Sequence, residues 1–330
     1  MSSYVKRLIF QLSLVLLLCL TSCATLPEHS KDKNQLAYIA DYDETITRRH
    51  LPVFIIENSN ENHNLIGTPS AKITEEAKEE IYINTERSSI YSETRKFSTQ
   101  NDSYTNLIYR IHFASVPFSL FPFHLGWGSN VGVIVVVTLN SDGMPILYTI
   151  VQTCGCYLAF IPTSYMPLDA FPDDWNKERQ TVYGENLPGL LDLKDVPFNQ
   201  SITLIFIKNG LHRVKDMAVS NVDSLMGYKT EKALIQALDS LQRLSLTGRG
   251  STSFYENSGS RKGYVKGSSK PWERLLMSWW AFDWKVGQDK KLGRDKEDGS
   301  LFYTSLKPWA RDESDMRVFS TFLKYWGWKL

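Results

Sequence analysis

The apolar positions in the middle of the chain recur with a period of two, or in short continuous runs, as is typical of β-strands. Residues 131–139 are almost continuously β-branched, which suits a strand that is buried on both faces. The turn residues of 140–143 then lead into another apolar run. Asn209-Gly210 is the strongest hairpin dipeptide, because both residues tolerate positive φ. The pattern predicts strands and hairpins at about 106–113, 131–139, 146–151, 201–208 and 211–219.

Helical spacing occurs only late in the chain. Thr230 is a suitable N-cap, and leucines follow it at intervals of three or four residues, at Leu234, Leu238, Leu241 and Leu244. This spacing predicts a helix over 231–245. Pro271 can open a second helix, over 272–284, and a last apolar stripe predicts a helix over 312–326.

These elements together predict the α+β class, with a β-rich body and the late helices packed on it. The chain has 330 residues, of which 42% are hydrophobic, so it can bury a sizeable core. We expect a single domain over 46–330, because the segment after residue 270 is too short to fold alone. Residues 247–270 are rich in glycine, serine and basic side chains and are expected to form a flexible loop rather than a fold element.

Seven of the nine tryptophans lie between Trp272 and Trp328. Aromatic side chains can stack on sugars or lie at a membrane interface. Trp279, Trp280 and Trp284 fall on different faces of the expected helix, which favours packing in the core over a single exposed strip.

The N-terminal segment is typical of an export signal. Lys6 and Arg7 precede the apolar run Leu8–Leu20, which is 13 residues long and therefore too short to span a bilayer comfortably. The sequence Leu20-Thr21-Ser22-Cys23 that follows resembles the lipobox of bacterial lipoproteins. The resemblance implies that residues 1–22 are removed as a signal peptide and that Cys23 is acylated.

This resemblance implies a cell-envelope protein that is held at a membrane by lipid on Cys23, with 23–45 as a tether. Ala24, rather than Asp, follows the cysteine, which implies the outer membrane if the source is Gram-negative. No later apolar run reaches 18 residues, so no transmembrane helix is expected in the mature chain.

The charge distribution narrows the range of partners. The net charge of +1 excludes a global basic field for nucleic acid. Residues 247–330 carry 16 basic and 10 acidic side chains, whereas 23–246 carry 19 and 26. The two parts can attract each other within the fold, or the basic part can meet envelope proteins, anionic lipid or cell-wall polymer.

Cys154-Gly155-Cys156 is the most suggestive interior motif. In an extended chain the two Cα atoms would be about 6.5–7 Å apart, at the limit of disulfide geometry, unless Gly155 bends the backbone. The pair can form a structural disulfide or act as a redox-active dithiol. It can also hold half of the ligands of a soft metal ion.

Two histidines and two acids are further candidates. His112 and His124 precede the central strands and can approach the cysteines as metal or redox partners. Asp169 and Asp173 lie near Trp175 and are candidate catalytic carboxylates for a carbohydrate substrate. The chain contains no nucleophile elbow, zinc-protease, P-loop or dinucleotide motif.

The leading hypothesis from the sequence is a membrane-anchored envelope lipoprotein that acts by binding or assembly, because no complete catalytic motif is present. The first alternative is a thiol-dependent redox or metal-binding protein centred on Cys154 and Cys156. A carbohydrate-active or cell-wall-binding protein is the second alternative.

Overall fold

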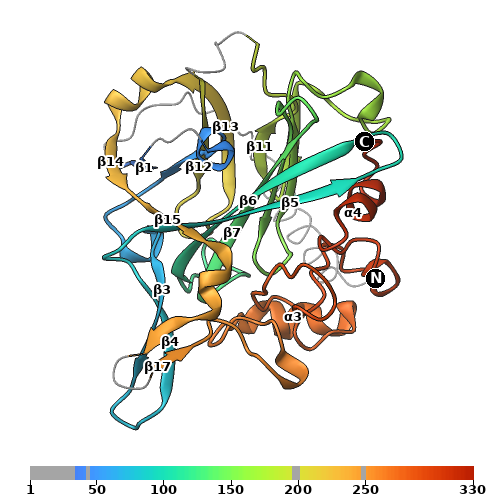
Figure 1. The fold of residues 1–330 in the computed structure, drawn as a ribbon. Coiled ribbons are helices and arrows are strands. Elements are labelled where there is room, and N and C mark those ends of the chain that lie inside the picture. Colours follow the sequence, from blue (N-terminus) through green and yellow to red (C-terminus); the bar gives the residue numbers. More distant parts are fainter. Residues whose placement is uncertain (1–33, 42–44, 195–200, 247–249) are drawn as a thin grey trace, which may run out of the picture. The chain divides into compact units, whose positions relative to one another are not determined.

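A six-stranded sheet carries the longest strands of the chain (Figure 1). The computed structural model describes residues 34–41, 45–194, 201–246 and 250–330, all within one unit that spans Lys33–Leu330. In spatial order the sheet consists of β15 (Leu234–Ala237), β5 (Ser89–Ser98), β6 (Ser103–Val116), β7 (Gly128–Leu139), β8 (Pro145–Gln152) and β9 (Leu158–Pro162). Within this sheet the β15–β5 pair is parallel and the other four pairs are antiparallel.

A five-stranded sheet combines strands from the start of the described chain with strands from residues 201–232. Its spatial order is β13 (Val214–Asn221), β12 (Ser201–Ile207), β2 (Val53–Ile56), β1 (Leu36–Ile39) and β14 (Lys229–Lys232). β14 pairs with β1, and β15 pairs with β5 in the other sheet. Ala233 alone separates β14 from β15, so one short segment closes an edge of both sheets.

Three two-stranded ribbons and several short helices complete the fold. The ribbons pair β3 (Thr68–Ile73) with β4 (Glu79–Asn84), β10 (Arg179–Val182) with β11 (Glu185–Pro188), and β16 (Leu244–Leu246) with β17 (Gly250–Thr252). The α-helices are α2 (Ile46–Arg49), α3 (Pro271–Ala281) and α4 (Phe319–Tyr325). The 3-10 helices are η1 (Asn62–Asn64), η2 (Leu168–Ala170), η3 (Val222–Gly227), η4 (Leu238–Gln242), η5 (Gly259–Arg261) and η6 (Pro308–Ala310).

The main core lies between the two large sheets. Alternate residues of β7, such as Val133 and Val135, pack with Phe54 and Ile205 of the five-stranded sheet. The intervening residues, such as Ile134, face a second core that is covered by the C-terminal segment. β7 is therefore buried on both faces, as its β-branched run predicts.

The β-rich α+β class is confirmed, because strands make up 41% and helices 16% of the structure. All five predicted strands are present, and Asn209-Gly210 joins β12 to β13 as an antiparallel hairpin. The helix predicted over 272–284 is also present as α3, which ends where Phe282 adopts a left-handed conformation.

The helix predicted over 231–245 is wrong. This stretch forms β14, β15, η4 and β16 instead. Leu234 is more than half exposed, whereas Leu241 is buried, so the leucines do not share one face. Pairing with β1 and β5, far away in the sequence, satisfies the backbone of 229–237 and overrides the local helical spacing.

The helix predicted over 312–326 is too long, because only Phe319–Tyr325 is helical. The carboxylate of Asp315 accepts hydrogen bonds from the backbone N–H groups of Phe302 and Arg317. These contacts hold the preceding residues in turns.

The loop predicted over 247–270 is wrong for its described part. Residues 250–270 contribute β17 and η5 and bury Phe254, Tyr255 and Val265. Backbone bonds from Phe254 N–H to Leu241 O and from Lys266 N–H to Phe254 O fix the segment on the body. The composition of the segment does not show that these three side chains, which lie between the glycines, are buried.

The tether expected over 23–45 is wrong for Leu36–Ile39, which form the strand β1 within the five-stranded sheet. The predicted signal peptide 1–22 and Cys23 lie outside the described residues. Among the described residues, no helix is both long and apolar enough to cross a membrane.

Candidate functional site

The Cys154-Gly155-Cys156 motif forms a tight turn directly after β8. The backbone N–H of Gly155 donates to Gln152 O at 2.7 Å. Gly155 has a φ of +85°, and a Cβ at this position would lie 2.3 Å from Tyr303 O. Glycine is therefore required here by both the backbone conformation and the close approach of the Tyr303 segment.

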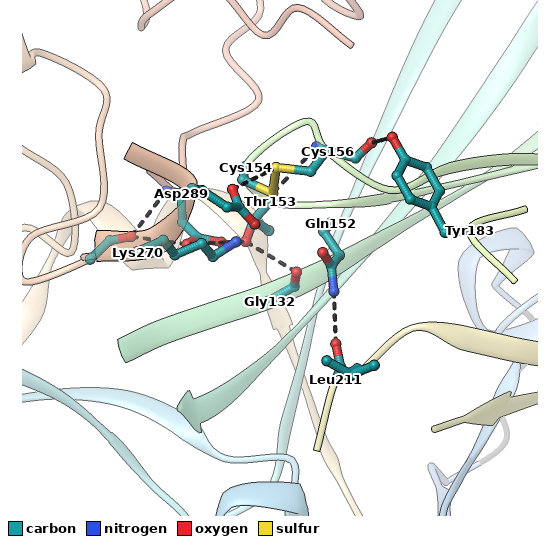
Figure 2. Close-up of a disulfide and its surroundings, with 11 residues drawn as sticks. Gly132, Gln152, Thr153, Cys154, Cys156, Tyr183, Leu211, Lys270 and Asp289 are labelled. Atoms are coloured by element: carbon teal, nitrogen blue, oxygen red, sulfur yellow. Dashed lines mark hydrogen bonds and ion pairs between the residues drawn. A yellow bond between two sulfur atoms is a disulfide. The ribbon is translucent and has the colours of Figure 1, made fainter. Parts of the chain in front are cut away.

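This turn brings the two cysteines together as a disulfide, with their Cα atoms 5.4 Å apart (Figure 2). The bend at Gly155 accounts for the difference from the 6.5–7 Å of an extended chain. Cys154 is buried and Cys156 is half-buried. The Cys156 N–H points at Cys154 Sγ at 3.3 Å, and Tyr183 OH donates to Cys156 O at 3.2 Å.

Glu273, in the first turn of α3, reaches the disulfide from across the fold. Its Oε2 lies 3.2 Å from Cys156 Sγ, although the two residues are 117 positions apart. The side chain is buried, and Gly126 and Gly287 leave the space that its carboxyl occupies. Burial raises the pKa of Glu273, opposed by the charge of Lys270. Burial thus favours the protonated form of the carboxyl that faces the sulfur, and this form can donate to it.

A buried ion pair lies on the other side of the turn. Lys270 Nζ and Asp289 Oδ2 are 3.6 Å apart, and both side chains are almost fully buried (Figure 2). Asp289 also accepts hydrogen bonds from Thr153 and from Ser268. Thr153 directly precedes Cys154, so this pair ties the turn to the segment that enters α3.

Lys290 places a second buried cation beside the turn. Its Nζ has no hydrogen-bond partner and lies 3.7 Å from the ring centroid of Tyr303. A Cβ on Gly155 would be 4.0 Å from this nitrogen, so the ammonium lies close to the motif. Burial lowers the pKa of Lys290 to about 8, opposed by Asp283, Asp289 and Asp315.

A cavity of about 100 Å³ opens onto the disulfide. Its walls are mainly apolar and include Leu125, Leu211, Met277 and Val286. Polar groups from Glu273, Lys270, Arg213 and Tyr183 converge on the same space. A mainly apolar pocket with a few convergent polar groups is the usual form of a small-ligand site.

Cys154, Cys156 and Glu273 also form the one candidate metal site in the part of the chain that the structure describes. Their ligand atoms lie within 4.8 Å of one another. A soft metal requires deprotonated thiols, so these residues fit a metal only after the disulfide is reduced.

The two candidate histidines lie elsewhere. His112 is fully buried, and its Nε2 accepts from Arg110 Nε at 2.8 Å. Its ring packs against those of Tyr91 and Phe254. His124 is hydrogen-bonded through Nδ1 to Pro117 O at 2.9 Å. Neither histidine belongs to the ligand group around the cysteines.

The two candidate aspartates share no catalytic arrangement. Asp169 lies exposed in η2, and the exposed Asp173 forms an ion pair with Lys329. Trp175 packs against the buried Trp328, with ring centroids 4.9 Å apart, and does not form an open platform. The geometry gives the carbohydrate hypothesis no support.

Sequence reasoning missed Glu273 and Lys290. Glu273 follows Pro271 in a first helical turn, where an acid is common for helix stability alone. Lys290 is one of many lysines in a basic region. Their role depends on contacts across more than a hundred residues, which leave no local signal. No family model, curated protein or solved structure matches the chain.

Proposed function

We propose that the protein is a lipid-anchored envelope protein that exchanges thiols and disulfides at Cys154–Cys156. The contact between Glu273 Oε2 and Cys156 Sγ inside a cavity is the observation that supports this most. It favours the redox alternative over binding alone, because a buried acid on a disulfide sulfur supplies the proton that exchange requires.

The burial of the two cysteines indicates which of them is attacked, because Cys154 is buried and Cys156 is only half-buried. The substrate is a dithiol, on a protein or a small molecule. Its first thiolate attacks the half-buried Cys156 Sγ, and the S–S bond breaks. The electron pair stays on Cys154 Sγ as a thiolate. The Cys156 N–H and the cations Lys270 and Lys290 stabilise the thiolate as it forms.

A second step completes the transfer. The other substrate thiol gives its proton to Cys154 Sγ and attacks the substrate sulfur of the mixed disulfide. Cys156 Sγ leaves and takes a proton from Glu273, whose carboxyl lies against it and is then reprotonated by water. The products are a substrate disulfide and the Cys154–Cys156 dithiol, so two electrons and two protons have moved to the protein.

The short loop argues against a purely structural disulfide. Chain-entropy stabilisation grows with loop length, and a three-residue loop yields only about 1.5 kcal/mol. A 15-residue loop yields about 3 kcal/mol. The disulfide therefore adds little stability to a fold that already has two large hydrophobic cores.

The experiment is to titrate the folded, full-length protein with dithiothreitol and to follow the thiols of Cys154 and Cys156 by alkylation and mass spectrometry. We expect reduction without unfolding, with formation of oxidised dithiothreitol in equal amount. Reduction that occurs only after denaturation would overturn the redox proposal.

The anchor is tested separately. Intact mass spectrometry of protein extracted from membranes should show removal of residues 1–22 and acyl chains on Cys23. Cys23→Ser should abolish the acyl mass and release the protein from the membrane fraction. An unmodified Cys23 would refute the anchor and leave the disulfide chemistry unaffected.

A further inference from the structure

Helix α3 presents its apolar stripe to the outside of the protein. Trp272, Leu275, Leu276, Trp279 and Trp280 recur at intervals of three and four residues and so share one face. Trp279 and Trp280 are 64% and 68% exposed. The expectation that these tryptophans pack in the core is therefore wrong.

The inward face of the same helix is the polar one. Glu273 and Ser278 are buried there, together with the small Ala281. On this inward face Glu273 lines the cavity and contacts the sulfur of Cys156. The usual orientation of an amphipathic helix on a protein body is thus reversed, which leaves a large apolar surface without cover among the described residues.

Neighbouring segments extend this surface. Phe282 and Trp284 follow α3 and are 81% and 73% exposed. The segment Phe118–Phe123 reaches α3 through Phe123, whose ring centroid lies 5.8 Å from that of Trp272. Phe121 in this segment is 95% exposed. We call α3, residues 282–284 and Phe118–Phe123 the aromatic face.

We propose that the aromatic face lies in the surface of a phospholipid bilayer. Tryptophan is enriched where a protein meets the membrane–water interface, since its ring is apolar and its N–H is polar. An amphipathic helix with Trp and Leu on one side binds in the plane of that interface.

Charge and chain length favour lipid over other occupants. Arg274, on α3 itself, is exposed and can meet anionic headgroups. The inference also rests on the proposed anchor, because only ten residues lie between Cys23 and Asn34. An extended chain of that length reaches about 40 Å at most, so an acylated protein is confined to the neighbourhood of the bilayer.

The test uses protein extracted from membranes and reconstituted into vesicles of phosphatidylethanolamine and phosphatidylglycerol that carry brominated acyl chains. Bromine quenches tryptophan fluorescence only on contact. We expect strong quenching of the wild-type protein and a loss of at least half of the quenched signal in Trp279→Ser/Trp280→Ser. Trp175→Phe removes a tryptophan that packs on Trp328 and should leave the quenched signal unchanged.

Two results would overturn the proposal. One is equal quenching of the double variant and the wild-type protein. The other is a concentration-dependent dimer that the double variant loses while quenching stays low, because a second copy would then cover the face. Quenching without acyl mass on Cys23 would support the membrane contact and refute the anchor alone.

Discussion

Glu273 Oε2 lies 3.2 Å from Cys156 Sγ, on a helix whose opposite side carries the exposed Trp279 and Trp280. Residue 273 therefore serves the disulfide cavity, and its neighbours along α3 form the aromatic face. This arrangement explains why α3 buries polar side chains and exposes apolar ones. It also leads to four predictions about the site.

Glu273→Gln keeps the shape of the side chain and removes the acidic proton of the carboxyl group. We expect thiol–disulfide exchange to slow at least tenfold, since a positioned general acid typically contributes 10²-fold or more. The measurement is the rate of reduction by dithiothreitol, divided by its thiolate concentration, from pH 5 to 9. In the wild-type protein this normalised rate should fall as the pH rises through the raised pKa of Glu273.

The variant should show no such fall, and Glu313→Gln, at an exposed acid, should behave as wild type. The raised pKa also means that the folded protein binds the proton of the Glu273 carboxyl more tightly than the unfolded chain does. Its contribution to stability is therefore present at low pH and is lost as the pH rises through the folded value. A wild-type pH profile in Glu273→Gln would remove the carboxyl from the mechanism.

Cys154→Ala/Cys156→Ala should abolish exchange and cost little stability. The expected loss in the free energy of unfolding is about 1.5 kcal/mol, from the entropy of a three-residue loop. Alanine avoids burial of a new hydroxyl at Cys154. Urea unfolding measures the change, and a loss of more than about 4 kcal/mol would indicate a structural disulfide instead.

Lys290→Met should stabilise the fold at pH 7 and slow exchange. The lowered pKa, about 8 against the ordinary 10.5, means that the charged form costs about 3 kcal/mol at neutral pH. Loss of the contact with the Tyr303 ring offsets about 1 kcal/mol of the gain.

In the wild-type protein the folded state binds the Lys290 proton less tightly than the unfolded chain, so stability rises between about pH 8 and 10.5. The advantage of Lys290→Met should accordingly shrink as the pH approaches 10. Urea unfolding at pH 7 and 10 measures this, with Lys307→Met as the control at an exposed lysine. Destabilisation at pH 7 would contradict the prediction.

Gly155→Ala should destabilise the protein by about 3 kcal/mol or more, because a positive φ and a clash with Tyr303 O combine. Gly184 provides a matched control, since its φ is +83° and a Cβ there meets nothing within 4 Å. Gly184→Ala should cost only about 1 kcal/mol. Equal losses in the two variants, measured by thermal unfolding, would mean that the Tyr303 segment yields easily.

The sequence predicts the centre of the fold better than its periphery. The strands around Val135 and the Asn209-Gly210 hairpin follow from local patterns, because β-branched runs and turn residues act within a few positions. The segment from Leu234 to Leu244 misleads, since its pairing partners are distant in the sequence. Cys154 and Cys156 are recognisable as a pair, but Glu273 reaches them only through the tertiary fold.

The short segment that carries β14 and β15 has a consequence for the order of folding. The five-stranded sheet combines residues 36–56 with residues 201–232, and the outermost strand of the six-stranded sheet is β15. Because synthesis begins at the N-terminus, β1 and β2 are made long before β14, and their sheet can be completed only when the last third of the sequence is being made. Such long-range pairing folds slowly and leaves strand edges open meanwhile. A chain interrupted before residue 229 would expose both unfinished edges at once.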